Sequence, residues 1–240
     1  MNIKKKYFKL FFRNKIVLGH SSIYRNPKMS KYILFKNKKF DIINPIKILK
    51  LKNETKKFLT KLAYQGGRIL FVGTKKQVKE IIEKFANKVK MPYINYKWPA
   101  GLLTNINNTR LSIKNKNLLI KQKKKIFKYL SKKDKNLINR KFKKINKKFG
   151  TILNMNKVPD AIIIVDVKKE IIALNEAYKS SLYIIGLVDT DSNPDKIDYP
   201  IPINDDLSKS VNYILKDLTK SILKGLRLRK KKIIYDYKKK

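Results

Sequence analysis

Two parts of the chain alternate short apolar runs with segments that have the period of a helix. In the first part, the apolar run Arg68–Thr74 precedes Lys75–Val89, where apolar side chains recur three and four residues apart. In the second part, the apolar runs Asp160–Asp166 and Leu182–Asp189 flank another helical pattern. Strands that are apolar throughout and alternate with helices are typical of a parallel sheet. The pattern therefore predicts an α/β domain with helices on both faces of the sheet.

Shorter elements precede this alternation. Tyr32–Asn44 has the pattern of two short strands joined by a turn at Lys36–Lys39. Pro45 then begins a helical pattern that ends at Gly66 and Gly67, which are typical of a helix stop. Its expected inward-facing positions are Ile46, Leu49, Phe58, Leu59 and Leu62.

Further elements complete the predicted domain. Pro92–Asn95 is predicted to be a second strand of the first part, and Tyr199–Asp205 an edge strand of the second. A last helix is predicted from about Asp206 to Leu226. The basic segment from residue 227 to the end is expected to be loose.

Between the two parts lies a segment without any strand pattern, residues 105–150. Its first half repeats an apolar residue every seven positions: Ile106, Ile113 and Ile120. Its second half has apolar residues four and three positions apart: Ile138, Phe142, Ile145 and Phe149. Ser131 and Asp134 have the spacing of a capping box that starts a helix. Two narrow apolar stripes joined by a turn predict an inserted, antiparallel coiled-coil hairpin.

The predicted organisation is therefore a domain interrupted by an insertion. Residues 1–104 are the first part of the α/β domain, with a basic N-terminal arm, and residues 151–226 are its second part. Residues 105–150 are the basic coiled-coil hairpin, and residues 227–240 are a basic tail.

Charge narrows the choice of partners. Sixty Lys and Arg residues against seventeen Asp and Glu give the 240-residue chain a net charge of +43. Self-repulsion on this scale destabilises a compact fold unless a polyanion offsets it. Nucleic acid is the leading partner, because neutralising phosphates releases counterions; an anionic membrane surface is the alternative for the charge alone. Part of the lysine and asparagine content is typical of an AT-rich genome, so the placement of the charge is more informative than its size.

Composition also excludes several kinds of chemistry. The chain has no cysteine, so disulfides and thiolate metal sites are excluded, and His20 is its single histidine. No apolar run reaches the ~18 residues of a membrane span. The basic start of the chain has the character of an import signal, but domain-like sequence begins by Ile16, so no removable presequence is expected.

One segment has the position of a phosphate loop. Gly73, Thr74 and Lys75 follow a strand and precede a helix, which is where α/β folds bind phosphate. Neither of the full glycine-rich phosphate motifs is present. A turn glycine and a capping threonine explain the segment equally well. A basic α/β enzyme that binds a nucleotide or phosphate is therefore the alternative function.

An acidic segment near the C-terminal end raises the question of a metal. Asp189, Asp191 and Asn193 alternate as in a calcium loop, but the glycine and the final glutamate of such a loop are missing. Asp189, Asp191 and Asp205 remain weak candidates for a Mg²⁺ shared with RNA phosphate. Turn formation, with a helix cap at Asp205, is the simpler interpretation. No metal and no cofactor of the protein itself are expected.

Five stretches together carry a resemblance to a known family. In chain order they are LGHSSIYRNPKMSKYI, GGRILFVGTKKQ, YINYKWPAGLLTN, VPDAIIIVDVKKEIIALNEA and LVDTDSNPDKIDYPIPINDD. They resemble the bacterial-type ribosomal protein S2 of the small subunit over roughly residues 16–226. The resemblance implies a flavodoxin- or Rossmann-like domain with an inserted coiled-coil hairpin. It also implies a structural, non-catalytic constituent of the ribosome that binds small-subunit rRNA.

The partners implied are small-subunit rRNA and neighbouring small-subunit ribosomal proteins, with neither a membrane nor a second copy of the chain. Basic, polar and aromatic residues of the matching stretches and of the start of the hairpin are expected to contact RNA. They are His20, Tyr24, Arg25, Asn26, Lys28, Lys75, Lys76, Lys97, Trp98, Asn105, Arg110 and Lys114.

The single tryptophan, Trp98, has two interpretations. It is either a packing anchor where the sheet leads into the hairpin or a platform on which an RNA base stacks. Gly101 is expected to allow a sharp bend, and Thr104 or Asn105 to cap the first hairpin helix. The family pattern has leucine and glycine directly after the tryptophan, where this chain has Pro99 and Ala100.

The resemblance and the composition together suggest a compartment. A bacterial-type ribosomal protein from an AT-rich genome, without a presequence, resembles an organelle-encoded protein. A plastid of the apicoplast kind is the preferred location, with the mitochondrion and a small-genome bacterium as alternatives.

Overall fold

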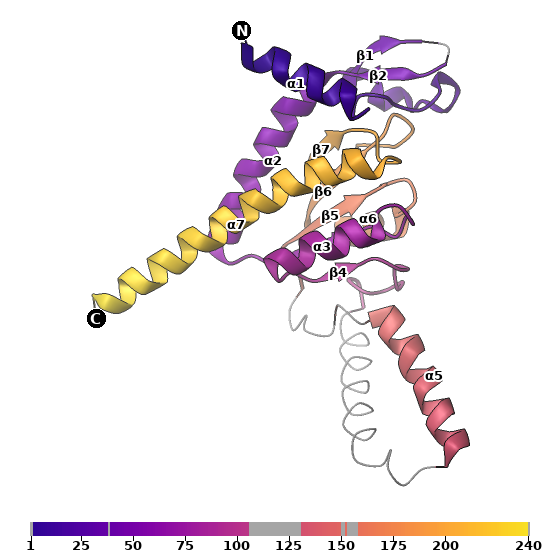
Figure 1. The fold of residues 1–240 in the computed structure, drawn as a ribbon, viewed down its shortest axis with the longest axis vertical. Helices are drawn as coiled ribbons and strands as arrows, with labels where there is room; N and C mark the ends of the chain where they lie inside the picture. The colour runs from indigo at the N-terminus through magenta and orange to yellow at the C-terminus, as the bar shows by residue number, and fades with distance from the viewer. Residues whose placement is uncertain (1, 38, 106–130, 150–151, 153–157, 240) are drawn as a thin grey trace.

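A computed structural model describes residues 2–37, 39–105, 131–149, 152 and 158–239, and its centre is a five-stranded parallel sheet (Figure 1). The strands in spatial order are β4 (Tyr93–Ile94), β3 (Ile69–Val72), β5 (Ala161–Val165), β6 (Tyr183–Val188) and β7 (Tyr199–Pro202). Numbered along the sheet's own chain order, this is 2-1-3-4-5, the flavodoxin-like arrangement. Because β3 pairs directly with β5, segments on both sides of residues 105–150 form one sheet. The prediction of a parallel α/β fold is confirmed.

Helices and a short hairpin surround the sheet (Figure 1). The helices are α1 (Asn2–Arg13), α2 (Pro45–Gln65), α3 (Lys79–Val89), α5 (Lys132–Phe149), α6 (Ile171–Lys179) and α7 (Ser208–Lys238). Two 3₁₀ turns, η1 (Ser22–Tyr24) and η2 (Pro27–Tyr32), lead into β1 (Ile33–Lys36) and β2 (Asp41–Ile43). The last two pair antiparallel, as predicted.

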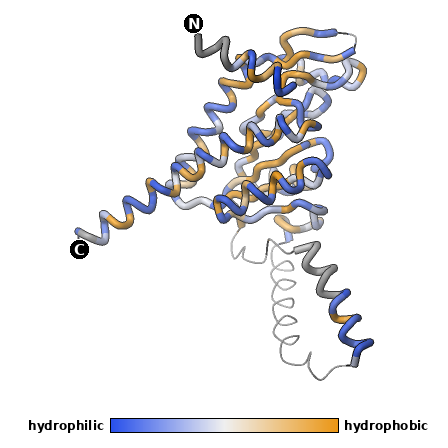
Figure 2. Tube along the Cα trace, in the orientation of Figure 1, coloured by the Kyte–Doolittle hydropathy of each residue, from blue (hydrophilic) through white to orange (hydrophobic). Residues whose placement is uncertain are grey.

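The sheet separates two apolar cores. Successive residues of a strand point to opposite faces, so Ile163 packs with α2, α3 and α7, whereas its neighbour Ile162 packs with α6 and the segment that contains Trp98. Burial on both faces explains why every residue of β5 is apolar. Figure 2 shows that the apolar segments follow the strands and the helices packed on them, while the outer half of α7 is largely hydrophilic.

The local signals at the ends of α2 act as predicted. Asn44 caps its start by accepting hydrogen bonds from the backbone of Ile46 and Lys47. Gly66 ends it in the left-handed conformation with φ of 89°. The inward assignment of Ile46 is wrong, because its side chain is 53% exposed. The buried face of α2 includes Pro45 and Ile48. Ile46 stands two residues before Ile48, and residues two apart lie on nearly opposite sides of a helix.

A buried lysine joins α1, α2 and α7. Lys52 is 2% exposed, and its Nζ donates to Asp217 Oδ2 on α7 at 2.8 Å. The same ammonium lies 4.8 Å from the ring centre of Tyr213 and 5.7 Å from that of Phe11. A carboxylate and aromatic faces together stabilise a cation that has left water. This contact attaches the basic N-terminal arm to the domain.

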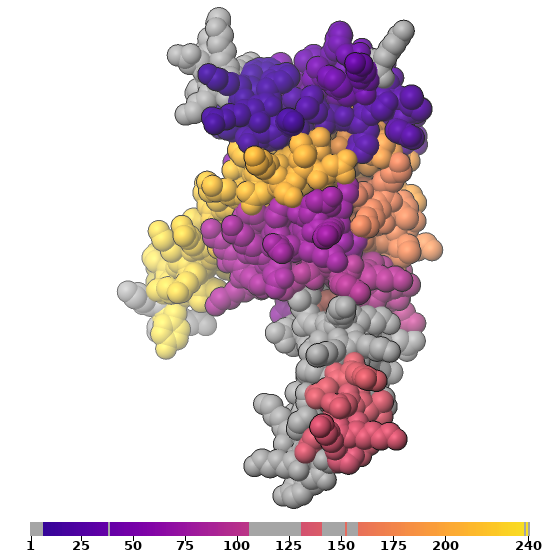
Figure 3. Space-filling view, turned by 45° about the vertical axis from the view of Figure 1, so that its right-hand side comes forward, coloured from indigo at the N-terminus to yellow at the C-terminus, as the bar shows by residue number. Residues whose placement is uncertain are grey.

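The C-terminal helix is longer than predicted. The sequence placed its end near Leu226, followed by a loose tail, but α7 continues to Lys238 and stands clear of the body (Figures 1 and 3). No glycine or proline follows Gly225, and Arg, Leu and Lys are good helix formers. Arg229 also lies against Gly66, where a Cβ would meet its guanidinium. The prediction of a loose tail is therefore wrong.

The insertion is described only in part. Its first predicted helix and the turn lie outside the described residues. The second helix is present as α5, and it begins where the capping signal placed it. The backbone N–H of Asp134 donates to Ser131 Oγ at 3.2 Å, and that hydroxyl donates to the Asp134 carboxylate at 2.7 Å. The pairing of two helices into a hairpin stays a prediction.

Within the described part of the chain, no helix is long and apolar enough to cross a membrane.

Helix α7 packs closely on α2 at a glycine, which makes Gly225 a test of the fold. A Cβ built there would lie 2.4 Å from the carbonyl oxygen of Thr60 and 2.8 Å from the Ala63 Cβ. We expect Gly225→Val to lower the free energy of unfolding by about 2 kcal/mol, because the helices must separate. The measurement is urea unfolding, with Arg227→Val, at an exposed position two residues on, as the matched control. Equal unfolding midpoints for the two variants would contradict the close approach.

Candidate nucleic-acid interface

Most of the residues predicted to contact RNA gather at the carboxyl edge of the sheet. Lys75 and Lys76 follow β3, and Lys97 and Trp98 follow β4. Carboxyl ends of parallel strands meet at one edge, which is where open α/β folds bind ligands.

The predicted residues His20–Lys28 reach the same edge through contacts with Thr190, which lies two residues after the end of β6. The backbone N–H of His20 donates to Thr190 Oγ1 at 2.9 Å, and that of Asn26 donates to the Thr190 carbonyl oxygen at 2.9 Å. Residues from both ends of the chain are thus brought together.

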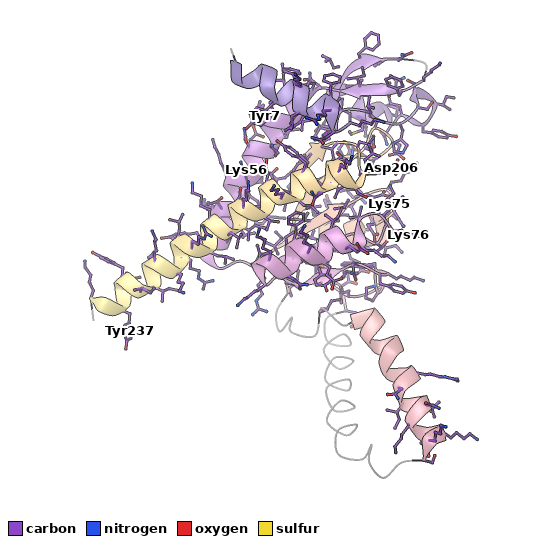
Figure 4. All side chains as sticks on the ribbon, viewed as in Figure 1. Tyr7, Lys56, Lys75, Lys76, Asp206 and Tyr237 are labelled. Atoms are coloured by element: carbon purple, nitrogen blue, oxygen red, sulfur yellow. The ribbon has the colours of Figure 1, made fainter. Side chains whose placement is uncertain are left out.

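Lys75 is surrounded by carboxylates at this edge. Its Nζ lies 2.9 Å from Asp166 Oδ2, 3.2 Å from Asp205 Oδ1 and 2.5 Å from Asp206 Oδ1. Figure 4 shows Lys75 and Asp206 side by side at the start of α7. Burial lowers the pKa of Lys75, but the hydrogen bonds that its ammonium donates to Asp206 and Asp166 outweigh burial and raise that pKa well above its usual value. The ammonium is charged and fully engaged inside the protein.

The candidate phosphate loop is occupied by the protein's own groups. The carboxylate of Glu170 accepts hydrogen bonds from the backbone N–H of Thr74 at 3.2 Å and from the Thr74 hydroxyl. A Cβ at Gly73 would lie 2.9 Å from Ile82, so this glycine serves helix packing. Burial raises the pKa of Glu170, and its bonds with Thr74 oppose that shift. The donors that would bind a phosphate are already satisfied, which removes the structural basis for the nucleotide-binding alternative.

The three weak metal candidates have other partners. Asp189 Oδ1 accepts from the backbone N–H of Thr190 at 2.6 Å, and Asp191 Oδ2 accepts from Lys168 Nζ at 2.9 Å. Asp205 is 1% exposed, and burial, with the charges of Asp189 and Asp166, raises its pKa to about 8. In the described ranges, no three His, Cys, Asp or Glu side chains are arranged to hold a metal ion. Asp205 instead contacts Lys75, Asp189 contacts His20, and Asp191 contacts Lys168.

His20 is an ion-pair partner rather than an exposed ligand. Its Nδ1 lies 3.2 Å from Asp189 Oδ2, and its Nε2 lies 3.1 Å from Asp206 Oδ2. The contact with Asp189 raises its pKa to about 9, although burial opposes the shift. Asp206 therefore joins the two cations of the edge, His20 and Lys75.

The neighbours of His20 are partly engaged as well. Arg25 Nε lies 3.4 Å from the buried carboxylate of Asp41, and Lys28 Nζ contacts Asp195. Asn26 caps η2 by accepting from the backbone N–H of Lys28 at 3.0 Å. Tyr24 remains 66% exposed, so its ring is open to a partner.

Trp98 is an anchor of the second core. It is 6% exposed, and its indole N–H donates to Glu176 Oε1 at 3.0 Å. The backbone N–H groups of Gly101 and Leu103 donate to the same carboxylate at 2.7 and 3.0 Å. Gly101 has φ of 80°, which provides the predicted bend. The arrangement favours the anchor interpretation of Trp98 over base stacking.

Of the remaining predicted residues, Lys76 and Lys97 are exposed at the carboxyl edge, and Asn105 is exposed further along. The backbone N–H of Asn105 donates to the carbonyl oxygen of Gly101 at 2.9 Å. Arg110 and Lys114 lie outside the described residues, as does any helix that Thr104 or Asn105 would cap.

Sequence reasoning missed two lysines and one carboxylate of this edge. Lys168 and Lys169 follow β5 and are exposed beside the predicted residues. The pattern that could have identified them is local: the two lysines follow Val167, just after the predicted strand that ends at Asp166. Glu176, which binds three donors around Trp98, gave no local signal, because its partners lie more than seventy residues away.

Comparison with known proteins agrees with the family resemblance seen in the sequence. The family model described as ribosomal protein S2 matches residues 11–225. A protein of Karelsulcia muelleri (strain GWSS), named small ribosomal subunit protein uS2, is 47% identical over 206 residues, covering 85% of this chain and 93% of that protein. A protein of the same name from Helicobacter acinonychis (strain Sheeba) is 37% identical over 218 residues, covering 90% of this chain and 89% of that protein. Another, from Francisella tularensis subsp. novicida (strain U112), is 38% identical over 206 residues, covering 85% and 86%.

The carboxylate of Glu176 gives a prediction with an intrinsic probe. Glu176→Ala leaves the indole and two backbone N–H groups without their acceptor in a buried place, so we expect a loss of about 3 kcal/mol in unfolding free energy. Because Trp98 is the only tryptophan, its emission should shift to longer wavelength as water enters. Glu80→Ala, at an exposed glutamate, is the control. Unchanged emission and stability in Glu176→Ala would show that this carboxylate does not support the bend.

The single histidine gives a second prediction, by NMR titration. The His20 ring should titrate near pH 9 rather than 6.5, and Asp206→Asn should lower that pKa while Asp195→Asn leaves it unchanged. Since the folded pKa exceeds the unfolded one, the stability that His20 contributes is complete below about pH 6.5 and is lost as pH rises through about 9. A ring that titrates at its ordinary value would exclude the ion pairs.

Proposed function

This chain belongs to the ribosomal protein S2 family, and we propose that it binds small-subunit rRNA through the exposed rim of the carboxyl edge of its sheet. Membership makes it a structural, non-enzymatic constituent of the small ribosomal subunit that supports translation. The proposal concerns which of its surfaces meets RNA. The observation that carries it is the contrast at this edge between cations that are held by carboxylates and cations that face solvent.

The rim consists of Tyr24, Lys76 and Lys97, extended by Lys169. All four are exposed, and they come from four different parts of the chain. Lys28 is exposed as well, but its ammonium is paired with Asp195, so it is not counted in the rim. Lysines contact phosphate oxygens without reading sequence, and an exposed tyrosine adds a face for an unpaired base. Lys75 and His20 lie beneath, where they neutralise the acids that would otherwise repel phosphate. They support the rim from inside the protein.

The remaining predicted contacts extend the rim toward the insertion. Asn105 leads out of the Trp98 bend, and Arg110 and Lys114 follow it in sequence. We propose that the basic insertion, α5 included, also meets rRNA, with neighbouring small-subunit proteins as further partners. Any Mg²⁺ at this surface would be held by RNA phosphates, because the carboxylates of Asp189 and Asp205 already serve the protein.

The cellular compartment is a more specific question than the ribosomal role. The composition supports translation from an AT-rich genome, which is compatible with a plastid, a mitochondrion or a bacterium with a small genome. The 47% identity to a protein of Karelsulcia muelleri, an insect endosymbiont, supports the third alternative, a bacterium with a small genome. We propose this origin in place of an organelle.

Sedimentation of cell lysate tests the function. In a sucrose gradient at moderate salt, the chain should co-migrate with small-subunit rRNA and follow that RNA when EDTA separates the subunits. A chain that stays at the top of the gradient at physiological salt would overturn the ribosomal role.

A charge-neutral variant tests the rim. A triple variant, Lys76→Gln, Lys97→Gln and Lys169→Gln, should reduce the slope of log affinity for small-subunit rRNA against log salt by about 3, because three phosphate contacts are lost. Lys84→Gln, Lys88→Gln and Lys179→Gln, at exposed lysines of α3 and α6, are the matched control. If both triple variants change the slope equally, RNA binding does not depend on the rim.

A further inference from the structure

A groove between α2 and α7 lies away from the carboxyl edge. It encloses about 830 Å³. Its floor forms where the two helices touch at Gly225, and there the Thr60 hydroxyl donates to the carbonyl oxygen of Ser221 at 3.2 Å. Its lining residues are Asn53, Lys56, Lys57, Thr60, Lys61, Tyr64, Lys220, Ser221, Lys224 and Leu228.

Lysines of both helices face this groove in matching pairs. Lys57 and Lys61 are one turn apart on α2, and Lys220 and Lys224 are one turn apart on α7. All four are exposed, and none forms an ion pair with a carboxylate of the described residues. None of the ten residues that line the groove is acidic. The carboxylate of Asp217, on α7, is taken by the buried Lys52 instead.

The outer end of the groove adds an aromatic ring and a longer basic wall. Tyr64 is 38% exposed, and Lys232 Nζ lies 5.8 Å from its ring centre. Arg229 rests against Gly66, which fixes the continuation of α7 on the end of α2. Beyond this contact, α7 carries Lys230, Lys231 and Lys232 away from the body (Figure 1). The result is one elongated cationic surface with a ring for stacking.

We propose that this groove binds the phosphate backbone of an rRNA strand, as a second RNA surface separate from the carboxyl rim. This inference rests on the proposed function, since it names a further surface for the same partner. Unneutralised lysines along two helices match a linear polyanion, and the ring of Tyr64 suits an unpaired base.

Directed hydroxyl-radical cleavage tests the groove in assembled subunits. Because the chain has no cysteine, a single introduced cysteine is its only thiol to which the iron probe can be attached. We expect Asn53→Cys, in the groove, and Lys76→Cys, in the rim, to cleave rRNA at different sites. Lys179→Cys, on the opposite face of the sheet, is the matched control. Neutralising the four groove lysines should weaken the cleavage from position 53 and leave the cleavage from position 76 unchanged. The four changes are Lys57→Gln, Lys61→Gln, Lys220→Gln and Lys224→Gln.

The outcomes separate this inference from the proposed function. Cleavage from position 76 with none above control from position 53 would overturn the groove and keep the rim. A ribosomal protein, rather than rRNA, found crosslinked to position 53 would also overturn it. Subunits that lack the chain, with no cleavage from any position, would overturn both proposals.

A measurement in solution complements this one. The four lysine-to-glutamine changes should reduce the salt slope of rRNA affinity by about 3 to 4. Four exposed lysines elsewhere, Lys36, Lys39, Lys84 and Lys88, provide a control with the same change in net charge. An equal reduction in both variants would show that the groove lysines act only through net charge.

Discussion

One ammonium group, that of Lys75, lies where the loops after β3, β5 and β7 meet, and three carboxylates surround it. Without a cation at this point, the carboxylates of Asp166 and Asp206 would repel each other at the edge of the sheet, and the buried carboxyl of Asp205, whose pKa is already raised to about 8, would be still harder to ionise. The ion cluster connects to His20 through Asp206, and from there to the N-terminal segment. It holds together the ends of strands that are far apart in sequence. The same cluster fills the crevice in which a flavodoxin-like sheet would bind a ligand.

Some cationic side chains are thus neutralised by carboxylates within the protein, and others remain available to a partner. Lys52 and Lys75 are held by carboxylates inside the protein, and His20 is paired with two. The lysines of the rim and of the α2–α7 groove face solvent. A net charge of +43 is therefore concentrated on surfaces, where only a polyanion can neutralise it. This division fits a structural protein of a ribonucleoprotein particle better than a small-molecule enzyme.

The bend after β4 shows how an internal group can shape an outer surface. The carboxylate of Glu176 binds the indole of Trp98 and two backbone N–H groups. It therefore fixes the direction in which the chain leaves the sheet toward the basic insertion. Pro99 and Ala100, which depart from the family pattern, are compatible with this bend, because none of the three donors comes from either residue.

The sequence by itself determined the class of fold, the strands and most of the helices. Their signals are local: apolar runs, the glycine stop at Gly66 and the cap at Ser131. It also identified the family, because several motifs occur in one order. Only the tertiary structure decided the roles of individual charges. Lys75 and Lys76 are adjacent and chemically identical, yet one is enclosed by acids and the other is exposed. The length of α7 and the acceptor for Trp98 were decided in the same way. Electrostatic partners are chosen by proximity in space, and a local pattern contains no information about residues that folding brings from a hundred positions away.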